Sequence, residues 1–311
     1  MHYRQLGKSG VRVSVIGLGT NRFGNERVPQ EEVNRIIASA ADLGINHIDS
    51  ANIYTAGRSE ETLGVALQGK REQFVLATKF TQKMGEGVND RGASRYHLHN
   101  ALEASLRRLQ TDHIDLYYIH RWDDTTPLEE MLRGLDDVVR AGKVRYIGAS
   151  QFMAWQLARA NLLAELRGWS PFVVIQSHYH MLERELEKEV LPFCREQGVG
   201  IIPFFPLAGG FLTGKYRRGQ PAPAGSRGES SAYVQAYMTD ANYTRIEALE
   251  GWAAAHGHAL GELAHAWLLG HAEVSSVISG VTALEQMQAN AKAAEWVLTP
   301  EEMAEVTALL A

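Results

Sequence analysis

The amino-acid sequence predicts an α/β protein, a (β/α)8 (TIM) barrel with an amino-terminal β-hairpin cap, and two observations support that prediction. Eight short segments are apolar on both faces, as buried parallel strands are. Segments with helical periodicity fill most of the gaps between them. Because 311 residues suit one large barrel, we expect residues 1–311 to form a single domain.

The first element in the chain is the predicted hairpin. Residues 3–14, YRQLGKSGVRVS, contain two short alternating strands around a turn at Gly7-Lys8-Ser9-Gly10. We expect this hairpin to close the amino-terminal end of the barrel.

Strand and helix candidates follow in alternation. The predicted strands are residues 13–18, 45–48, 74–79, 114–119, 144–149, 172–176, 200–205 and 274–279. The predicted helices are residues 30–43, 59–68, 94–109, 128–141, 153–166, 185–197, 241–256 and 283–296.

Several helix ends have their own markers. Gly44 and Gly142 stand where helices should stop, and Ser59 is a plausible N-cap. Thr299-Pro300 opens a last helix, with proline at its first position. Residues 207–240 have no clear period and are rich in Gly, Pro and Ser, which is typical of a long functional loop.

The composition narrows the classes of function. The net charge of −5 gives no support for nucleic acid or an anionic membrane as a partner. Cys194 is the only cysteine, which excludes an internal disulfide and a cysteine-based zinc site. The longest weakly polar stretch, residues 198–214, is interrupted by prolines and glycines and so is no membrane helix. We therefore expect a soluble, cytoplasmic protein without a membrane partner.

Four polar residues stand at or just beyond the carboxyl ends of predicted strands: Asp49, Tyr54, Lys79 and His120. In a parallel barrel those ends share one face, so the four side chains should converge. A lysine ammonium favours the ionised form of a neighbouring phenol, and a carboxylate keeps that ammonium charged. Tyr54 is then the predicted proton donor to a carbonyl oxygen, and His120 hydrogen-bonds or orients that oxygen. The hydride for the carbonyl carbon must come from a cofactor, because no side chain supplies one.

At these residues the sequence resembles the aldo-keto reductases, in the branch of bacterial aldo/keto reductases and potassium-channel β subunits. The resemblance is carried by GLGTNRFG (17–24), the segment from Asp49 to Glu60, VLATK, IDLYYIH, KVRYIGASQF (143–152), VIQSHYH (174–180), PLAGGFLTGKY (206–216) and SGVTALEQMQAN (279–290). These motifs run in order across nearly the whole chain. The family implies NADPH-dependent reduction of aldehydes or ketones to alcohols, reversibly, on a barrel without a Rossmann domain.

The resemblance also implies a cofactor site. Ser150 and Gln176 resemble the groups that hold the nicotinamide carboxamide, and Phe204 the aromatic residue that stacks on the ring. Lys215 resembles a residue of the pyrophosphate loop, and Arg227 a loop arginine near the adenosine phosphate. The full predicted set is Gly19, Thr20, Asn21, Asp49, Ser150, Gln151, Gln176, Phe204, Pro206, Leu207, Gly209, Thr213, Lys215, Arg227, Gly280, Thr282, Gln286 and Asn290.

Three departures from the family pattern concern this cofactor site. Position 151 is Gln where Asn is usual, and position 205 is Phe where small polar residues are common. Positions 281 and 283–285 contain no Arg or Lys, although a basic residue there often pairs with the 2′-phosphate of NADPH. Basic residues at 217, 218 and 227 are candidates to compensate, so NADPH is still expected over NADH.

The substrate is predicted to be a small carbonyl compound, bound by Tyr54, His120, Phe23 and Trp122, and the oligomeric state stays open. Two other functions compete. A cofactor-binding regulatory subunit of the channel-β type would keep the same four residues and turn over slowly. A metal-dependent hydrolase would use the alternating pair His178 and His180, but such barrels usually carry that pair on the first strand, so no metal is expected.

Overall fold

The computed structural model describes residues 1–310, and its centre is a closed barrel of parallel strands, which confirms the predicted (β/α)8 fold. Around the barrel the order is β10-β3-β4-β5-β6-β7-β8-β9. The strands are β3 (Ile16–Gly19), β4 (His47–Asp49), β5 (Val75–Phe80), β6 (Ile114–Ile119), β7 (Val144–Ser150), β8 (Phe172–His178), β9 (Gly200–Phe204) and β10 (Val277–Gly280).

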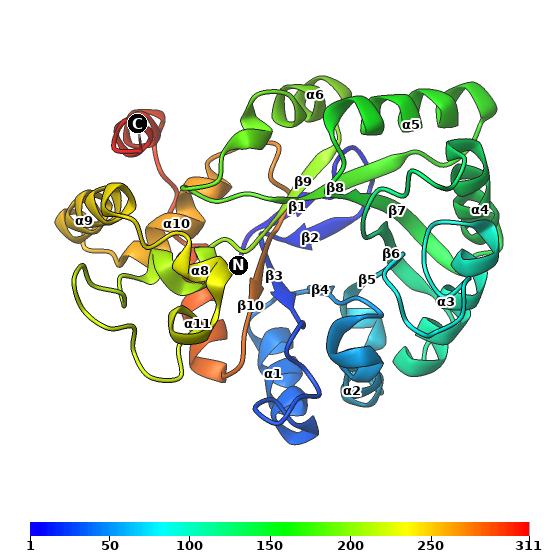
Figure 1. The fold of residues 1–311 in the computed structure, drawn as a ribbon, viewed down its shortest axis with the longest axis horizontal. Coiled ribbons are helices and arrows are strands. Elements are labelled where there is room, and N and C mark those ends of the chain that lie inside the picture. The colour runs from blue at the N-terminus through cyan, green and yellow to red at the C-terminus, as the bar shows by residue number, and fades with distance from the viewer. Residues whose placement is uncertain (311) are drawn as a thin grey trace.

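Helices surround these strands (Figure 1). They are α1 (Gln30–Asp42), α2 (Arg58–Ala66), α3 (Arg95–Leu109), α4 (Leu128–Arg140), α5 (Ala154–Arg167), α6 (Val190–Gln197), α7 (Arg227–Ser230), α8 (Ala232–Gln235), α9 (Asp240–Ala255), α10 (Leu260–Leu269), α11 (Leu284–Ala293) and α12 (Pro300–Ala308). Helix α4 illustrates why they pack on the barrel: Met131, Leu135 and Val138 lie on one buried stripe of the helix. As predicted, Thr299 caps α12, by accepting a hydrogen bond from the Glu302 N–H.

The hairpin cap is also present, as the antiparallel pair β1 (Tyr3–Gln5) and β2 (Arg12–Ser14). Its residues Leu6 and Val13 are fully buried and belong to the same apolar cluster as the barrel-interior residues Leu116 and Ile202. The hairpin therefore plugs the amino-terminal end of the barrel with side chains, and burial of those side chains holds it there.

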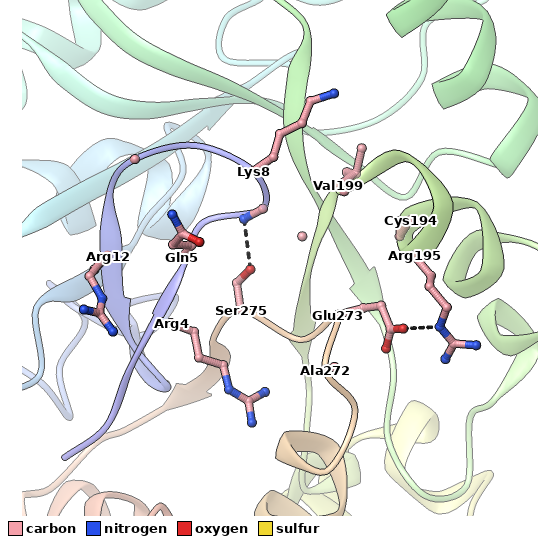
Figure 2. A pocket seen from close by; sticks show the side chains of 14 residues that line it. Arg4, Gln5, Lys8, Arg12, Cys194, Arg195, Val199, Ala272, Glu273 and Ser275 are labelled. Carbon is pink, nitrogen blue, oxygen red and sulfur yellow. Dashed lines mark hydrogen bonds and ion pairs between the residues drawn. The ribbon is translucent and has the colours of Figure 1, made fainter.

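A groove of about 710 Å³ lies beside this hairpin. Figure 2 shows the side chains that line it. Arg4 lies along it and donates hydrogen bonds to the carbonyls of Leu269, His271 and Val274, which tie the hairpin to the end of α10. Glu273, also in the groove, pairs with an arginine of α6. The hydrogen bonds of Arg4 and the ion pair of Glu273 therefore connect the elements at this end of the barrel.

Some boundaries differ from the predicted ones for physical reasons. The predicted strand 13–18 is two strands, since residues 12–14 complete the hairpin and residues 16–19 enter the barrel. The predicted helix 185–197 begins with a 3₁₀ turn (Glu185–Glu187), and its α-helix starts at Val190.

Helix α10 lies where the sequence pattern predicts no helix. It is buried on nearly all sides, so it has no polar face and therefore no helical period. Residues 207–240, predicted to be irregular, contain a 3₁₀ segment (Ala208–Thr213) and the two short helices α7 and α8.

The register of the barrel brings the carboxyl ends of its strands to one rim. Asp49 pairs with Ala77, Ser150 with Gln176, and His178 with Phe204. Polar residues from strands that are far apart in sequence therefore meet at this rim. Within residues 1–310, every helix is too short or too polar to cross a bilayer.

Candidate active site

The four candidate catalytic residues come from three neighbouring strands of the barrel. Asp49 is the last residue of β4, Lys79 is the fifth residue of β5, and His120 follows β6. Tyr54 begins a short 3₁₀ turn (Tyr54–Gly57) after β4. Since β4, β5 and β6 lie side by side, the four side chains meet at the carboxyl-terminal rim.

The Lys79 ammonium is the centre of this group. Its Nζ donates hydrogen bonds to Asp49 Oδ2 at 2.6 Å and to the Ser50 carbonyl at 2.7 Å. The same Nζ lies 3.3 Å from the Tyr54 hydroxyl. Asp49 Oδ1 accepts a further hydrogen bond from Gln176 at 2.8 Å. Lys79 and Asp49 are buried, so their opposite charges compensate each other away from water.

This environment sets the protonation of the group. Burial alone would lower the pKa of Lys79, but the negative charge of Asp49 and the phenol of Tyr54 outweigh it, and the pKa is raised. Lys79 therefore stays charged at neutral pH.

The pKa of Tyr54 departs from the sequence expectation. Lys79 lowers it, as expected, but burial raises it by more, so the phenol stays protonated at neutral pH. Burial, together with the charges of Lys79 and Arg121, lowers the pKa of His120 to about 3. The imidazole is therefore neutral and faces Tyr54 edge-on, with ring centroids 6.1 Å apart.

A strained turn presents Tyr54 to the site. Thr55 and Ala56, which follow it, have φ values of 48° and 54°, a left-handed conformation that residues with a Cβ seldom adopt. The Thr55 hydroxyl donates a 2.7 Å hydrogen bond to the Phe23 carbonyl, which holds the turn in place. Other left-handed residues stand in the loops that follow barrel strands: Thr81, Gln151, Phe205 and Ala208. Backbone strain of this kind collects at functional sites.

The four residues adjoin a cavity of about 1110 Å³. Asp49, Tyr54 and His120 line it, while Lys79 lies buried behind them. All the residues predicted to bind the cofactor line the same cavity: Gly19, Thr20, Asn21, Asp49, Ser150, Gln151, Gln176, Phe204, Pro206, Leu207, Gly209, Thr213, Lys215, Arg227, Gly280, Thr282, Gln286 and Asn290. Its volume lies just above the roughly 1000 Å³ upper end of the range of small-molecule sites.

Individual groups in this cavity fit a nicotinamide dinucleotide. The Ser150 hydroxyl is buried and has no hydrogen-bond partner within the described residues, as expected of a group that awaits a ligand amide. Lys215 folds across Gly210, whose φ of 101° and missing side chain leave room for the ammonium: a Cβ there would stand 2.8 Å from Nζ. The Arg227 guanidinium lies over the Phe205 ring at 5.4 Å. Arg217 and Arg218, by contrast, pair with acids of α9 and do not line the cavity.

Two predicted substrate residues are not at the cavity. Phe23 is fully buried in the apolar core. Trp122 packs edge-on against Phe152 and Trp155, at centroid distances of 5.0 and 5.9 Å. Neither is among the residues that line the cavity.

Several cavity residues were not predicted to belong to the site. Arg27, Arg121 and Lys292 add positive charge, and His178, Tyr233 and His265 add polar rings. One signal was available for His178: it lies two residues beyond Gln176 on the same strand and so points to the same side. Arg27 and Arg121 lie in loops, and Tyr233 and His265 lie in helices that the sequence did not predict, so the pattern gave no direction for these side chains. Lys292 lies in the predicted helix 283–296.

The histidine pair that suggested a metal is engaged in other contacts. His178 Nε2 lies 3.1 Å from His180 Nε2 and 2.6 Å from the Tyr233 hydroxyl. Within residues 1–310, no group of three or more His, Cys, Asp or Glu side chains is placed to hold a metal ion.

Comparison with known proteins places the chain in a family. Residues 15–311 match the model of the aldo/keto reductase family. The chain is 38% identical to the uncharacterized oxidoreductase YrpG of Bacillus subtilis, over 97% of this chain and 93% of that protein. It is 36% identical to a probable voltage-gated potassium channel subunit beta of Oryza sativa, over 100% of this chain and 97% of the relative. It is also 34% identical to the L-glyceraldehyde 3-phosphate reductase of Escherichia coli, over 94% of this chain and 87% of the relative.

The family model and these relatives cover nearly the whole chain, and the matching region includes both the strand-end residues and the cavity. The protein therefore belongs to the aldo/keto reductase family of nicotinamide-dependent oxidoreductases.

Proposed function

We propose that this protein reduces aldehydes and ketones to alcohols with NADPH, and catalyses the reverse oxidation, with Tyr54 as the proton donor. The observation that carries the proposal is the position of Lys79, which contacts both Asp49 and the Tyr54 hydroxyl at the floor of the cavity. That arrangement suits general acid catalysis at a carbonyl oxygen.

Each candidate residue has a distinct role in this reaction. When bound, the reduced nicotinamide supplies the hydride to the carbonyl carbon. Tyr54 gives its phenolic proton to the carbonyl oxygen, and the Lys79 ammonium stabilises the phenolate that remains. Asp49 keeps Lys79 charged and fixed in position. Neutral His120 orients the carbonyl oxygen by a hydrogen bond.

The cavity supports NADPH as the cofactor. Ser150 suits the nicotinamide carboxamide, and the Phe204 ring suits stacking. Lys215 and Arg227 supply positive charge for the phosphates, and Gln286 and Lys292 also line the cavity. Lys292 lies beyond positions 281–285, at which the sequence lacks a basic residue.

A fluorescence titration with NADPH and NADH, followed by NADPH oxidation with 4-nitrobenzaldehyde, tests the proposal. Tighter binding of NADPH and aldehyde-dependent oxidation support it. Failure to bind either nucleotide contradicts it.

The Tyr54→Phe variant tests the assigned proton donor. We expect it to lose at least about 100-fold in kcat, the range of general acid catalysis, while NADPH binding stays within about twofold. Tyr96→Phe is the matched control, because Tyr96 is exposed on α3. Full activity in Tyr54→Phe would refute the mechanism.

A second function follows from the similarity to plant channel β subunits over almost the whole chain. A regulatory subunit would bind NADPH tightly and turn over slowly. Retention of NADPH through gel filtration, with fewer than about one turnover per minute on reactive aldehydes, would favour that function over the reductase.

A further inference from the structure

The catalytic cavity carries more positive charge than its own acids balance. Its basic side chains are Arg22, Arg27, Arg121, Lys215, Arg227 and Lys292. The acids that line it are Asp49 and Glu262. Asp49 is paired with Lys79, and Glu262 pairs with Lys292 at 3.1 Å. The remaining arginines give the cavity a net positive potential, which attracts anionic ligands.

The strand order separates these cations into two groups. Lys215, Arg227 and Lys292 follow β9 or β10, with most of the groups proposed to bind NADPH. Arg121 directly follows His120 in the loop after β6, and Arg22 lies in the loop after β3. β3 is the neighbour of β10, and Asn21, the residue before Arg22, lies against Gly280, so Arg22 belongs with the cations on the cofactor side. The loops after β4 to β6 surround the proton-donating group, and Arg121 is the cation among them that lines the cavity.

The Arg121 guanidinium group is available. Arg121 is exposed to solvent in the cavity, and its side chain makes no hydrogen bond or ion pair within the described chain. Asp123, the acid nearest to Arg121 in sequence on the carboxyl side, is occupied: it accepts hydrogen bonds from Thr125, Thr126 and the Ala93 N–H. The protein thus leaves the charge of Arg121 uncompensated beside the catalytic histidine.

We propose that the preferred substrates are aldehydes or ketones that carry a carboxylate or phosphate group, which Arg121 binds. This inference rests on the proposed reductase function and names the substrate class of the same site. A guanidinium matches both anions, because its planar fork donates two parallel hydrogen bonds to their oxygens. Held by its anionic end next to His120, such a substrate has its carbonyl group directed toward Tyr54.

Two matched substrate pairs test the proposal. The carboxylate pair is 4-carboxybenzaldehyde and methyl 4-formylbenzoate, its neutral ester. The phosphate pair is glycolaldehyde phosphate and glycolaldehyde. For the native enzyme with NADPH, we expect kcat/KM to be about tenfold or more higher for the anionic member of at least one pair, the factor of one charge-assisted hydrogen bond. The pair that shows the preference identifies the anion.

Variants assign the preference to Arg121. Arg121→Gln should lower the anionic-to-neutral ratio of kcat/KM about tenfold, and Arg121→Lys should lower it less, since the charge remains without the fork. Arg133→Gln is the control: Arg133 is exposed on α4 and does not line the cavity, so its ratio should equal that of the native enzyme.

The outcomes separate this inference from the function on which it rests. A native ratio near or below one for both pairs would overturn it, as would an unchanged ratio in Arg121→Gln. A weaker affinity of that variant for NADPH, without a change in the ratio, would assign Arg121 to the cofactor instead. Absence of turnover with every aldehyde would refute the reductase function itself. If the variants fail to fold, a preference of the native enzyme that falls as salt rises from 0.05 to about 0.5 M still supports the proposal.

Discussion

Replacing Asp49 by Asn removes one charge from the buried pair with Lys79 while keeping the size of the side chain. In the native protein the Lys79 ammonium is fully buried, and its hydrogen bond to Asp49 Oδ2 is 2.6 Å long. The asparagine oxygen is still able to accept the hydrogen bond from Gln176. The main change is therefore the loss of the negative charge that compensates Lys79.

The size of the effect follows from burial. Removing one partner of a buried ion pair costs about 3–5 kcal/mol, because the other charge remains buried without compensation. We expect Asp49→Asn to lower the free energy of unfolding by about that amount at pH 7, measured by urea denaturation. A matched control is Asp124→Asn, because Asp124 is an exposed aspartate whose side chain makes no hydrogen bond or ion pair within the described residues. It should cost less than about 0.5 kcal/mol.

The pH dependence distinguishes a charge effect from a packing defect. In the native protein the pKa of Lys79 is raised, so its contribution to stability is complete below the unfolded-state pKa of about 10.4. That contribution is lost only as pH rises through the higher folded-state pKa. In the variant, Asp49 no longer offsets burial, so the folded-state pKa of Lys79 falls below its unfolded-state value. Between these two pKa values the unfolded state binds more protons than the folded state. The variant should therefore gain stability relative to the native protein as pH rises from 7 toward 10.

Two results would refute this reasoning. One is a loss of stability below about 1 kcal/mol at pH 7, which would mean that the pair is not desolvated as the structure has it. The other is a loss that stays constant between pH 7 and 10, because a packing defect does not titrate.

Three further predictions concern other parts of the molecule. Glu60→Gln should lower the free energy of unfolding by about 3 kcal/mol, because Glu60 is fully buried and pairs with Arg108. Glu185→Gln removes one partner of an exposed ion pair and should lower it by less than about 1 kcal/mol. Urea denaturation of the two variants measures the difference. Burial raises the pKa of Cys194 to about 12, so iodoacetamide at pH 8 should modify that thiol only after unfolding, and rapid labelling of the folded protein by mass spectrometry would contradict the structure. Because the pKa of Tyr54 is raised, the acid form needed for reduction persists through neutral pH, and kcat/KM for aldehyde reduction should be flat from pH 6 to about 9; a decline centred near pH 7 would exclude Tyr54 as the acid.

The left-handed backbone at the barrel rim explains why Asn is usual at position 151, and nothing in the structure explains the Gln that this chain has there. Gln151 has a φ of 57°, in the left-handed region, where Asn is better tolerated than most side chains. The Asn that the family usually has at this position fits that backbone. Phe205, the second departure, also has a positive φ, and its ring is covered by Arg227 and Tyr233. Packing at the mouth of the cavity therefore holds a conformation that the local sequence disfavours.

The sequence alone determined the features that depend on local pattern and chain order. Buried parallel strands read as short apolar runs, so the alternation with helices was visible and predicted the barrel. Parallel strands share one carboxyl-terminal rim, so the convergence of Asp49, Tyr54 and Lys79 followed from their places at strand ends. The residues predicted to bind the cofactor followed from the resemblance, and all of them line one cavity.

Only the tertiary structure decided the features that depend on how deeply a side chain is buried and on residues that are distant in sequence. Helix α10 is buried on nearly all sides, so its sequence lacks the alternation of apolar and polar residues that predicts a helix. Phe23 and Trp122 lie beside the site in sequence but pack elsewhere, because adjacency in a loop does not set the direction of a side chain. The pKa of Tyr54 is raised because its desolvation exceeds the effect of Lys79, and desolvation depends on how the whole barrel closes around the phenol.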